Sequence, residues 1–325
     1  MLSASRLALS AVCRNSQNAL LRTNPCARNF TQRSRLEKIV ERRRSLKEVV
    51  AKPAGSTAFE IGKGAIAGGS LFGLGALCYY GLTFEPTSVS TRAAIWPEYV
   101  KERVRTTYAY FGGGLAITAA SAAAIFRSPA AMNLVARNSI PAMIGSIVLI
   151  IGSNILVHSL PYEPGLNGKQ LAWAGHSALM GAMVAPLCIL GGPLLMRAAW
   201  YTAGVVGGLS AVACCAPSDK FMNMGGPLAV GLGVVFASSV GSAFLPPTTA
   251  LGAGLYSMSM YGGLLLFSAF LLYDTQKIMR RAETHPQYGV VPYDPINNSI
   301  SIYADTLNIF IRIAMLLGGG GSRKK

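Results

Sequence analysis

The chain has 325 residues, of which 51% are hydrophobic and only 13% are charged, and its mean hydropathy is +0.41. Soluble domains carry roughly 25% charged residues, so this composition excludes an ordinary soluble domain and predicts an all-α polytopic membrane helix bundle. The formal net charge of +16 resembles that of a nucleic-acid-binding protein. However, much of the charge lies in the N-terminal region and does not alternate with aromatic residues, so we expect no nucleic-acid partner.

The N-terminal region has the composition of a targeting segment. Residues 1–30 contain Arg and Ser but no acidic residue, which is typical of a mitochondrial transit peptide. The stretch "CARNFTQ" resembles a matrix-peptidase site, with cleavage expected near Phe30 and Thr31. The alternative is a disordered basic tail. Residues 31–63 continue as a basic segment with one apolar face, which suits an anionic lipid surface such as cardiolipin and suits a solvated spacer nearly as well.

Apolar stretches of about 20 residues, each long enough to cross about 30 Å of hydrocarbon, recur along the rest of the chain. We expect about eight transmembrane segments, at 64–83, 106–126, 138–158, 171–195, 198–217, 225–245, 250–273 and 297–317. The prolines of "LPPTT" divide the sixth from the seventh, because proline removes backbone hydrogen-bond donors. Lys and Arg are spread over both sets of loops, so the positive-inside rule leaves both membrane orientations open.

No catalytic motif is found in the sequence. Serine-hydrolase, zinc-protease and phosphate-loop patterns are missing, and the six cysteines lack the spacing of a zinc site or a disulfide framework. We therefore expect neither an enzyme nor a resident cofactor.

Two aspartates lie where charge is expensive. Asp274 ends an apolar run in "LLYDTQKI", and Asp305 lies within one in "YADTLNIFI". If the first helix leaves the membrane near Arg280 and the next enters near Asn297, the two carboxylates lie about 9 Å and about 12 Å inside. Two like charges at similar depth cannot both ionise cheaply, so such a pair shares a proton.

When both are ionised, the carboxylates form a hard oxygen site for a divalent cation, so protons and Ca²⁺ would compete for it. The sequence therefore predicts an ion and proton gate at Asp274 and Asp305, with Ca²⁺ bound transiently. The structural alternative is that Asp274 lies in the membrane interface and pairs with Lys277.

Other polar residues accompany this pair. Asn298, Ser301, Asp305, Asn308 and Arg312 recur at spacings of three and four and form one stripe on the last helix. Such a stripe must face protein or a water-filled cavity, with Arg312 near the far end expected to reach a lipid headgroup. His176, within the fourth span, is a candidate pH sensor, although a hydrogen-bonded core histidine fits its position better.

The two motifs resemble those of the Bax inhibitor family of membrane proteins, over residues 106–318. The leader, the extra first span at 64–83 and the basic tail at 319–325 resemble the mitochondrial branch of that family. The resemblance implies a seven-helix core with a pH-sensitive Ca²⁺ pathway closed by Asp274 and Asp305. It also implies that an arginine from an early helix, Arg127 or Arg137, completes the latch.

The resemblance further implies a multi-pass protein of the mitochondrial inner membrane that transports Ca²⁺ coupled to protons. It implies support of cristae organisation and restraint of cytochrome c release in apoptosis. The alternative is a scaffold that transports nothing and binds other inner-membrane proteins, in which the aspartates fix helix packing and residues 84–105 carry contacts.

Overall fold

The structure is a computed structural model that describes Gly75 and residues 96–135, 139–216, 221–246, 248–287 and 292–320. All of the secondary-structure elements assigned within these residues are helices. The helices are α6 (Glu98–Arg127), α7 (Pro129–Val135), α8 (Ile140–Ser159), α9 (Gly168–Val184), η1 (Ala185–Leu190), α10 (Gly192–Cys215), η2 (Met222–Met224), α11 (Gly225–Phe244), α12 (Ala250–Ser257), η3 (Met258–Gly262), α13 (Gly263–Thr284) and α14 (Pro295–Gly320).

Six helical stretches of the described chain are long and apolar enough to cross a membrane, which confirms a polytopic helical membrane protein. They are Glu98–Arg127, Pro141–Ser159, Gly168–Leu190, Met222–Phe244, Ala250–Thr284 and Pro295–Gly319. The count of eight is therefore not reached in this part of the chain. The predicted span at 198–217 corresponds to α10, a helix of 24 residues that is not among the six, and the span at 64–83 lies outside the described residues.

Local signals explain where several helices begin. Ser139 accepts a hydrogen bond from the Ala142 amide at the start of α8, and Thr249 accepts one from Gly252 at the start of α12. Each side chain satisfies a backbone donor that the first helical turn leaves free. Residues 98–105 lie before the predicted span at 106–126, but they already belong to α6, which begins at Glu98.

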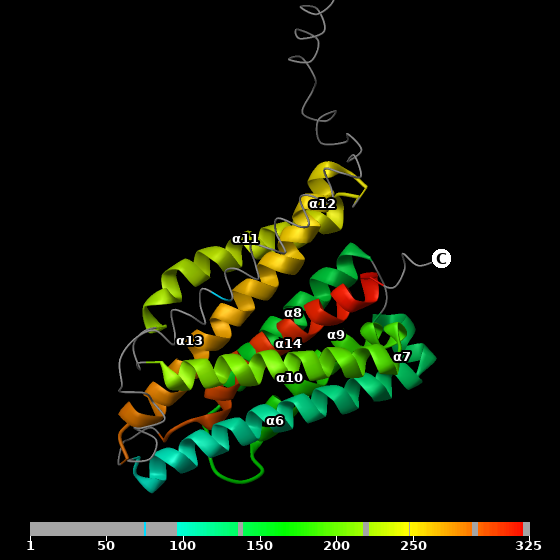
Figure 1. Ribbon diagram of the computed structural model, residues 1–325. Helices are drawn as coiled ribbons and strands as arrows, with labels where there is room; N and C mark the ends of the chain where they lie inside the picture. The colour runs from blue at the N-terminus through cyan, green and yellow to red at the C-terminus, as the bar shows by residue number, and fades with distance from the viewer. Residues whose placement is uncertain are drawn as a thin grey trace, which may run out of the picture.

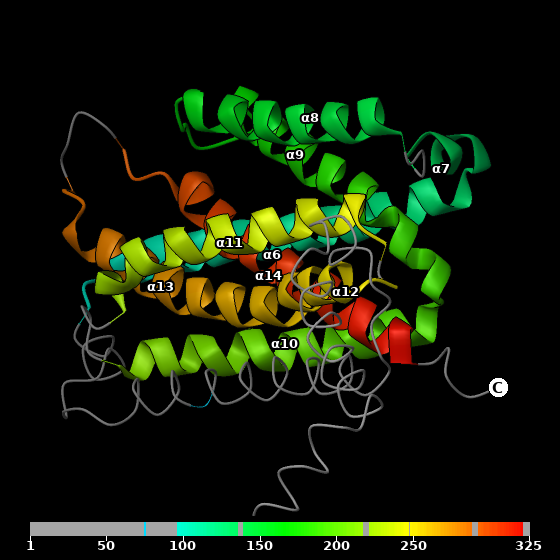
Figure 2. The ribbon, with the colours of Figure 1, turned by 90° about the horizontal axis from the view of Figure 1, so that it is seen from above.

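The last two helices lie at the centre of the bundle. Figure 1 shows α10 and α14 running side by side, and α14 also packs against α6 and α13. Figure 2 shows α8 and α9 together on one side of the molecule. The buried core of α13 and α14 includes Leu271, Leu272, Ile302 and Ile309. Polar residues on these two helices are therefore held in the most enclosed part of the protein.

The outer faces are strongly apolar. On α8, Val148 and Ile155 are each 61% exposed, and on α10 Trp200 is 73% exposed. Contiguous apolar surface of this kind is unfavourable in water, whereas it is the ordinary exterior of a helix in hydrocarbon. The pattern of exposure thus agrees with a bundle surrounded by lipid.

One long helical stretch contains a short π-helical segment. Residues Ala250–Thr284 form a continuous stretch in which α12 and α13 are joined by the π-helical segment η3. A π-helix uses hydrogen bonds from residue i to i+5, so it changes the direction of the carbonyl groups locally, and such segments are frequent at functional sites.

Candidate ion site between α13 and α14

Three pairs of residues face each other across the antiparallel helices α13 and α14. Arg281 bonds to Asn298, Asp274 interacts with Asp305, and Phe267 contacts Arg312. Successive pairs are seven residues apart on each helix, which is about two helical turns, so all three lie on the same face. We call Arg281 and Asn298 the outer layer, Asp274 and Asp305 the middle layer, and Arg312 with Ser259 and Asn308 the inner layer.

The middle layer is a buried carboxylate pair. Asp274 is 6% exposed and Asp305 is 5% exposed, and their side chains interact electrostatically with each other. Asp274 also interacts with Ser301 of α14. Lys277 forms a loose ion pair with Asp274, with its Nζ 3.9 Å from Oδ1. Asp274 thus contacts Asp305, as the gate hypothesis predicts, and also Lys277, as the structural alternative predicts.

One oxygen of this layer is unsatisfied. Oδ2 of Asp305 is buried and has no hydrogen-bond partner. A buried carboxylate oxygen without a donor is costly, so it favours a proton or a cation. No group of three or more His, Cys, Asp or Glu side chains able to hold a metal occurs in the described chain. A cation at the middle layer would therefore need hydroxyl, amide or carbonyl oxygens beside the two carboxylates.

The outer layer covers the end of α13 and α14 nearest their connection. Arg281 Nη1 donates to Asn298 Oδ1 over 2.8 Å, and Asn298 Nδ2 donates to the Asp294 carbonyl over 2.8 Å. Arg281 is exposed, whereas Asn298 is 7% exposed. Arg281 also interacts electrostatically with Asp274, so a positive charge lies beside the middle layer on this side.

The inner layer corrects the prediction for Arg312. Its side chain does not reach out to a headgroup but lies inside the bundle, 8% exposed. Nε donates to the Ser259 carbonyl over 3.1 Å, and Nη1 donates to the carbonyl and Oδ1 of Asn308 over 3.0 and 2.9 Å. The guanidinium carbon also lies 4.6 Å from the centre of the Phe267 ring. These contacts replace the water that the charge would otherwise need.

The polar stripe of the last helix faces protein, as predicted. Asn298, Asp305 and Arg312 are buried, and Ser301 and Asn308 are half-buried. Such a stripe satisfies the rule that polar side chains in a span avoid lipid.

Two other predicted site residues, His176 and Arg127, have their own surroundings away from the aspartates. His176 is 4% exposed on α9, where Nδ1 lies 2.8 Å from Ser153 Oγ and the ring meets that of Tyr303 edge-on. Arg127 is exposed at the last residue of α6. Arg137 lies outside the described residues, as do Phe30 and Thr31.

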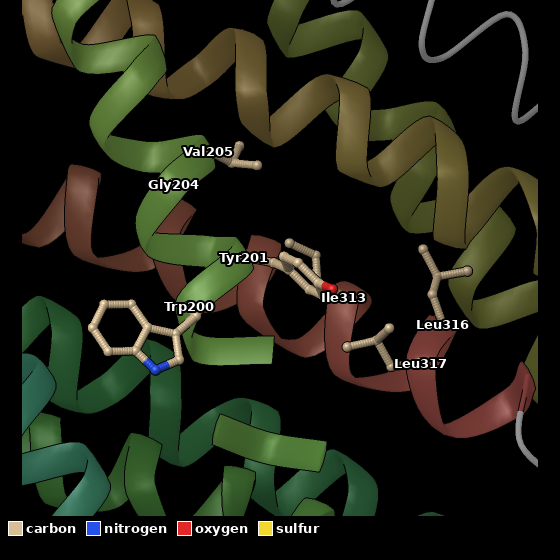
Figure 3. A pocket seen from close by; sticks show the side chains of 7 residues that line it. All are labelled: Trp200, Tyr201, Gly204, Val205, Ile313, Leu316 and Leu317. Atoms are coloured by element: carbon tan, nitrogen blue, oxygen red, sulfur yellow. The ribbon is translucent and has the colours of Figure 1, made fainter. Parts of the chain in front are cut away.

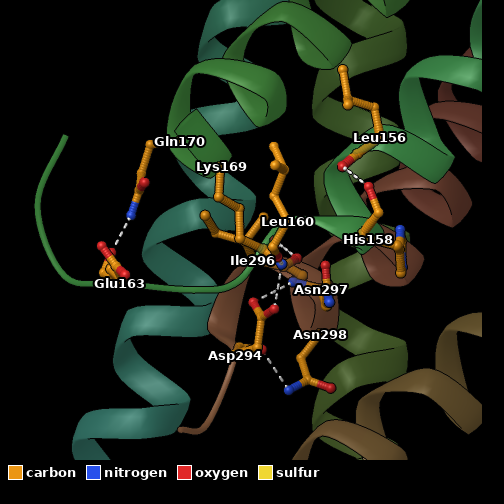
Figure 4. Close-up of polar contacts among 12 residues, drawn as sticks. Leu156, His158, Leu160, Glu163, Lys169, Gln170, Asp294, Ile296, Asn297 and Asn298 are labelled. Atoms are coloured by element: carbon orange, nitrogen blue, oxygen red, sulfur yellow. Dashed lines mark hydrogen bonds and ion pairs between the residues drawn. The ribbon is translucent and has the colours of Figure 1, made fainter. Parts of the chain in front are cut away.

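Sequence reasoning missed a buried ion pair near the start of α14. Lys169 is 1% exposed, forms a salt bridge with Asp294 and donates to the Leu160 carbonyl over 2.8 Å (Figure 4). Asp294 in turn accepts from the Asn297 amide over 2.9 Å and so caps α14. Lys169 precedes the predicted span at 171–195, so the sequence placed it among the loop charges, whereas the structure places it in the first turn of α9.

A second missed contact ties α6 to the end of α13. Arg103 donates to the carbonyls of Ala282, His285 and Pro286 over 2.8–3.1 Å. Nearby, Thr107 Oγ1 lies 3.0 Å from the Tyr293 hydroxyl, and burial raises the pKa of Tyr293. The ends of α6, α13 and α14 are thus joined beside the outer layer.

A separate apolar pocket of about 530 Å³ opens between α10 and α14 (Figure 3). Its lining residues are Trp200, Tyr201, Gly204, Val205, Ile313, Leu316 and Leu317. This lining has no charged side chain, so the pocket suits a hydrocarbon chain better than an ion. The three polar layers between α13 and α14 are therefore the better candidate for an ion site.

Comparison with known proteins identifies the class of protein. The family model described as "Inhibitor of apoptosis-promoting Bax1" matches residues 100–322. The chain therefore belongs to the Bax inhibitor family of membrane proteins, which confirms the resemblance of its two aspartate motifs.

Individual relatives refine this result. The chain is 57% identical over 284 residues to Growth hormone-inducible transmembrane protein of Rattus norvegicus, covering 86% of this chain and 82% of the relative. It is 30% identical over 231 residues to an uncharacterized protein of Helicobacter pylori, covering 68% of this chain and 88% of the relative. Bax inhibitor 1 of Homo sapiens is 27% identical over 186 residues, covering 56% of this chain and 73% of the relative.

Proposed function

We propose that the protein moves Ca²⁺ across a membrane in a proton-linked manner, as a pH-gated leak or a Ca²⁺/H⁺ exchanger, with Asp274 and Asp305 as its gate. The observation that carries the proposal is the buried carboxylate pair of the middle layer, in which Asp305 Oδ2 lacks a partner. A proton and a divalent cation both relieve the repulsion and desolvation of such a pair, so each excludes the other.

The proposed gate closes when the pair shares a proton, because a protonated carboxyl can donate to its neighbour. Loss of that proton leaves two negative charges. At an effective dielectric constant of 20, two unit charges 4 Å apart repel by about 4 kcal/mol. A difference of about 2.7 kcal/mol already changes an equilibrium a hundredfold. The repulsion is thus large enough to loosen the contact of α13 with α14 until Ca²⁺ binds.

The proposed setting is the mitochondrial inner membrane, supported by the acid-free, Arg- and Ser-rich composition of residues 1–30. We further propose that support of cristae and restraint of cytochrome c release follow from the ion balance that the transporter maintains. The protein would act without enzymatic activity or a resident cofactor, among membrane lipids that include cardiolipin and beside other inner-membrane proteins.

The test is Ca²⁺ flux into liposomes that contain the purified full chain, across an imposed pH gradient. The wild type should transport at a rate that follows the gradient, and Asp274→Asn and Asp305→Asn should each lose that dependence. Glu98→Gln is the matched control, because the Glu98 side chain is 89% exposed and lies outside the three layers. Wild-type liposomes that pass no Ca²⁺ at any pH would reject transport and favour the scaffold.

A further inference from the structure

Arg312 is a buried cation whose hydrogen bonds go to neutral oxygens. Its partners are the Ser259 carbonyl, the Asn308 carbonyl and Asn308 Oδ1, at 2.9–3.1 Å. Among the ion pairs found in the described chain, none includes Arg312. Inside a membrane span such a charge pairs with an opposite charge or with backbone carbonyls, and groups of this kind often mark ion pathways.

The cage has the ligand chemistry of a cation site. Backbone carbonyls and amide side-chain oxygens are ligands that Ca²⁺ takes, and carbonyl rings replace the hydration shell of ions in channels. Ser259 belongs to the π-helical segment η3, whose altered bonding directs its carbonyl across to α14. Three oxygens from two helices thus converge on one positive group.

The neighbouring residues leave room for that group. A Cβ on Gly263 would overlap Arg312 Nε and lie 2.7 Å from Nη2, so glycine is required while the guanidinium occupies this place. The Phe267 ring covers the guanidinium from α13. On the far side, Ser259 Oγ lies 2.6 Å from Ser239 Oγ, which continues the polar groups toward α11.

The cage lies on the line that leads from the aspartates into the bundle. Arg312 follows Asp305 by seven residues on the same face of α14, about 10 Å further along the helix. A cation that has passed the middle layer would therefore meet a fixed positive charge next.

We propose that Arg312 is a tethered cation that plugs a second, inner cation site formed by the carbonyls of Ser259 and Asn308 and the Asn308 side chain. When Arg312 leaves the cage, the same oxygens receive the transported cation. This inference rests on the proposed function, since it assumes that cations pass between α13 and α14, and it adds a barrier that is separate from the two aspartates.

The test replaces the plug and keeps the cage. In liposomes held at neutral pH, where the aspartate pair is ionised and the proposed gate is open, Arg312→Gln should raise the Ca²⁺ leak at least tenfold. Arg312→Lys is the matched control, because it keeps the charge, and it should stay within about twofold of the wild type. In detergent, millimolar CaCl₂ should raise the Tm of Arg312→Gln more than that of the wild type. An Arg312→Gln protein with wild-type leak and a wild-type response to CaCl₂ would overturn the proposal.

Two further outcomes are decisive. If Arg312→Gln does not fold, Gly263→Ala takes its place, because the added Cβ displaces the guanidinium without removing its charge. A raised leak would support the plug, and an unchanged one would overturn it. If the wild type transports no Ca²⁺, the proposed function fails, and the Tm response of Arg312→Gln to CaCl₂ alone decides whether the cage binds a cation.

Discussion

At the scale of single residues, the aspartate pair and Lys169 show two different ways of holding a buried charge. The carboxylates of Asp274 and Asp305 interact with each other, and Asp305 Oδ2 has no hydrogen-bond partner. Lys169, in contrast, forms an ion pair with Asp294 and a hydrogen bond with the Leu160 carbonyl. The first arrangement suits a group that changes its proton or ligand. The second suits a contact that holds the start of α14 in place.

The Lys169 pair gives a prediction on stability. Lys169→Ala should lower the free energy of unfolding by about 3 kcal/mol, because it removes a fully buried side chain and leaves the half-buried Asp294 carboxylate without its counter-charge. The Tm in detergent should fall by several degrees. Lys101→Ala is the control, since Lys101 pairs with exposed Glu98 and a surface pair contributes only about 0–1 kcal/mol. Equal Tm values for the two variants would show that the buried contact does not anchor α14.

Not all of these residue contacts could be read from the sequence. The polar stripe was predictable, because helical spacing fixes which residues share a face. The pairing of the aspartates followed from their depth in two consecutive helices. Arg312 and Lys169 were misjudged, because the direction of a long side chain depends on what a neighbouring helix offers, here the Ser259 carbonyl and Asp294.

At the scale of elements, α6 and α9 approach each other closely at Gly181. A Cβ at Gly181 would overlap the Thr118 carbonyl and lie 2.8 Å from Ser121 Cβ. The two backbones approach closely there, and Ser121 Oγ donates to the Ala178 carbonyl over 2.7 Å. Small residues serve this purpose in membrane helices, where packing rather than hydrophobicity drives association.

This contact predicts a clear difference between two glycines of α9. Gly181→Ala should cost about 1–3 kcal/mol, because an added methyl group forces the helices apart. Gly175→Ala has open space around the new Cβ and should be neutral or stabilise the helix by up to about 1 kcal/mol. Thermal unfolding of the two variants in the same detergent measures the difference. A Gly181→Ala protein as stable as Gly175→Ala would contradict the close packing of α6 on α9.

Helix existence was easier to predict than helix detail. Runs of about 20 apolar residues identify spans, because only an internally hydrogen-bonded helix crosses hydrocarbon alone. The start of α6 at Glu98 was missed because polar residues such as Lys101 and Arg105 form its exposed first turns. The π-helical segment η3 leaves no signal in the apolar pattern, since it adds no charge or proline to the run.

At the scale of the whole molecule, the outer surface of the bundle is apolar and its interior contains polar layers. Apolar side chains such as Val148 and Trp200 face outward, while the three polar layers lie between the two central helices. This distribution is the reverse of that in a soluble protein and keeps the polar side chains of α13 and α14 away from lipid. The two motifs predicted membership of the Bax inhibitor family, and the match of the family model over residues 100–322 confirms it.

Competition between protons and Ca²⁺ for the middle layer is tested most directly by the half-saturating Ca²⁺ concentration of flux, measured at several pH values. In the wild type this concentration should rise as the pH falls, by up to about tenfold per pH unit for one competing proton. It should no longer depend on pH in Asp305→Asn. A half-saturating concentration that stays constant with pH in the wild type would contradict competition at the aspartate pair.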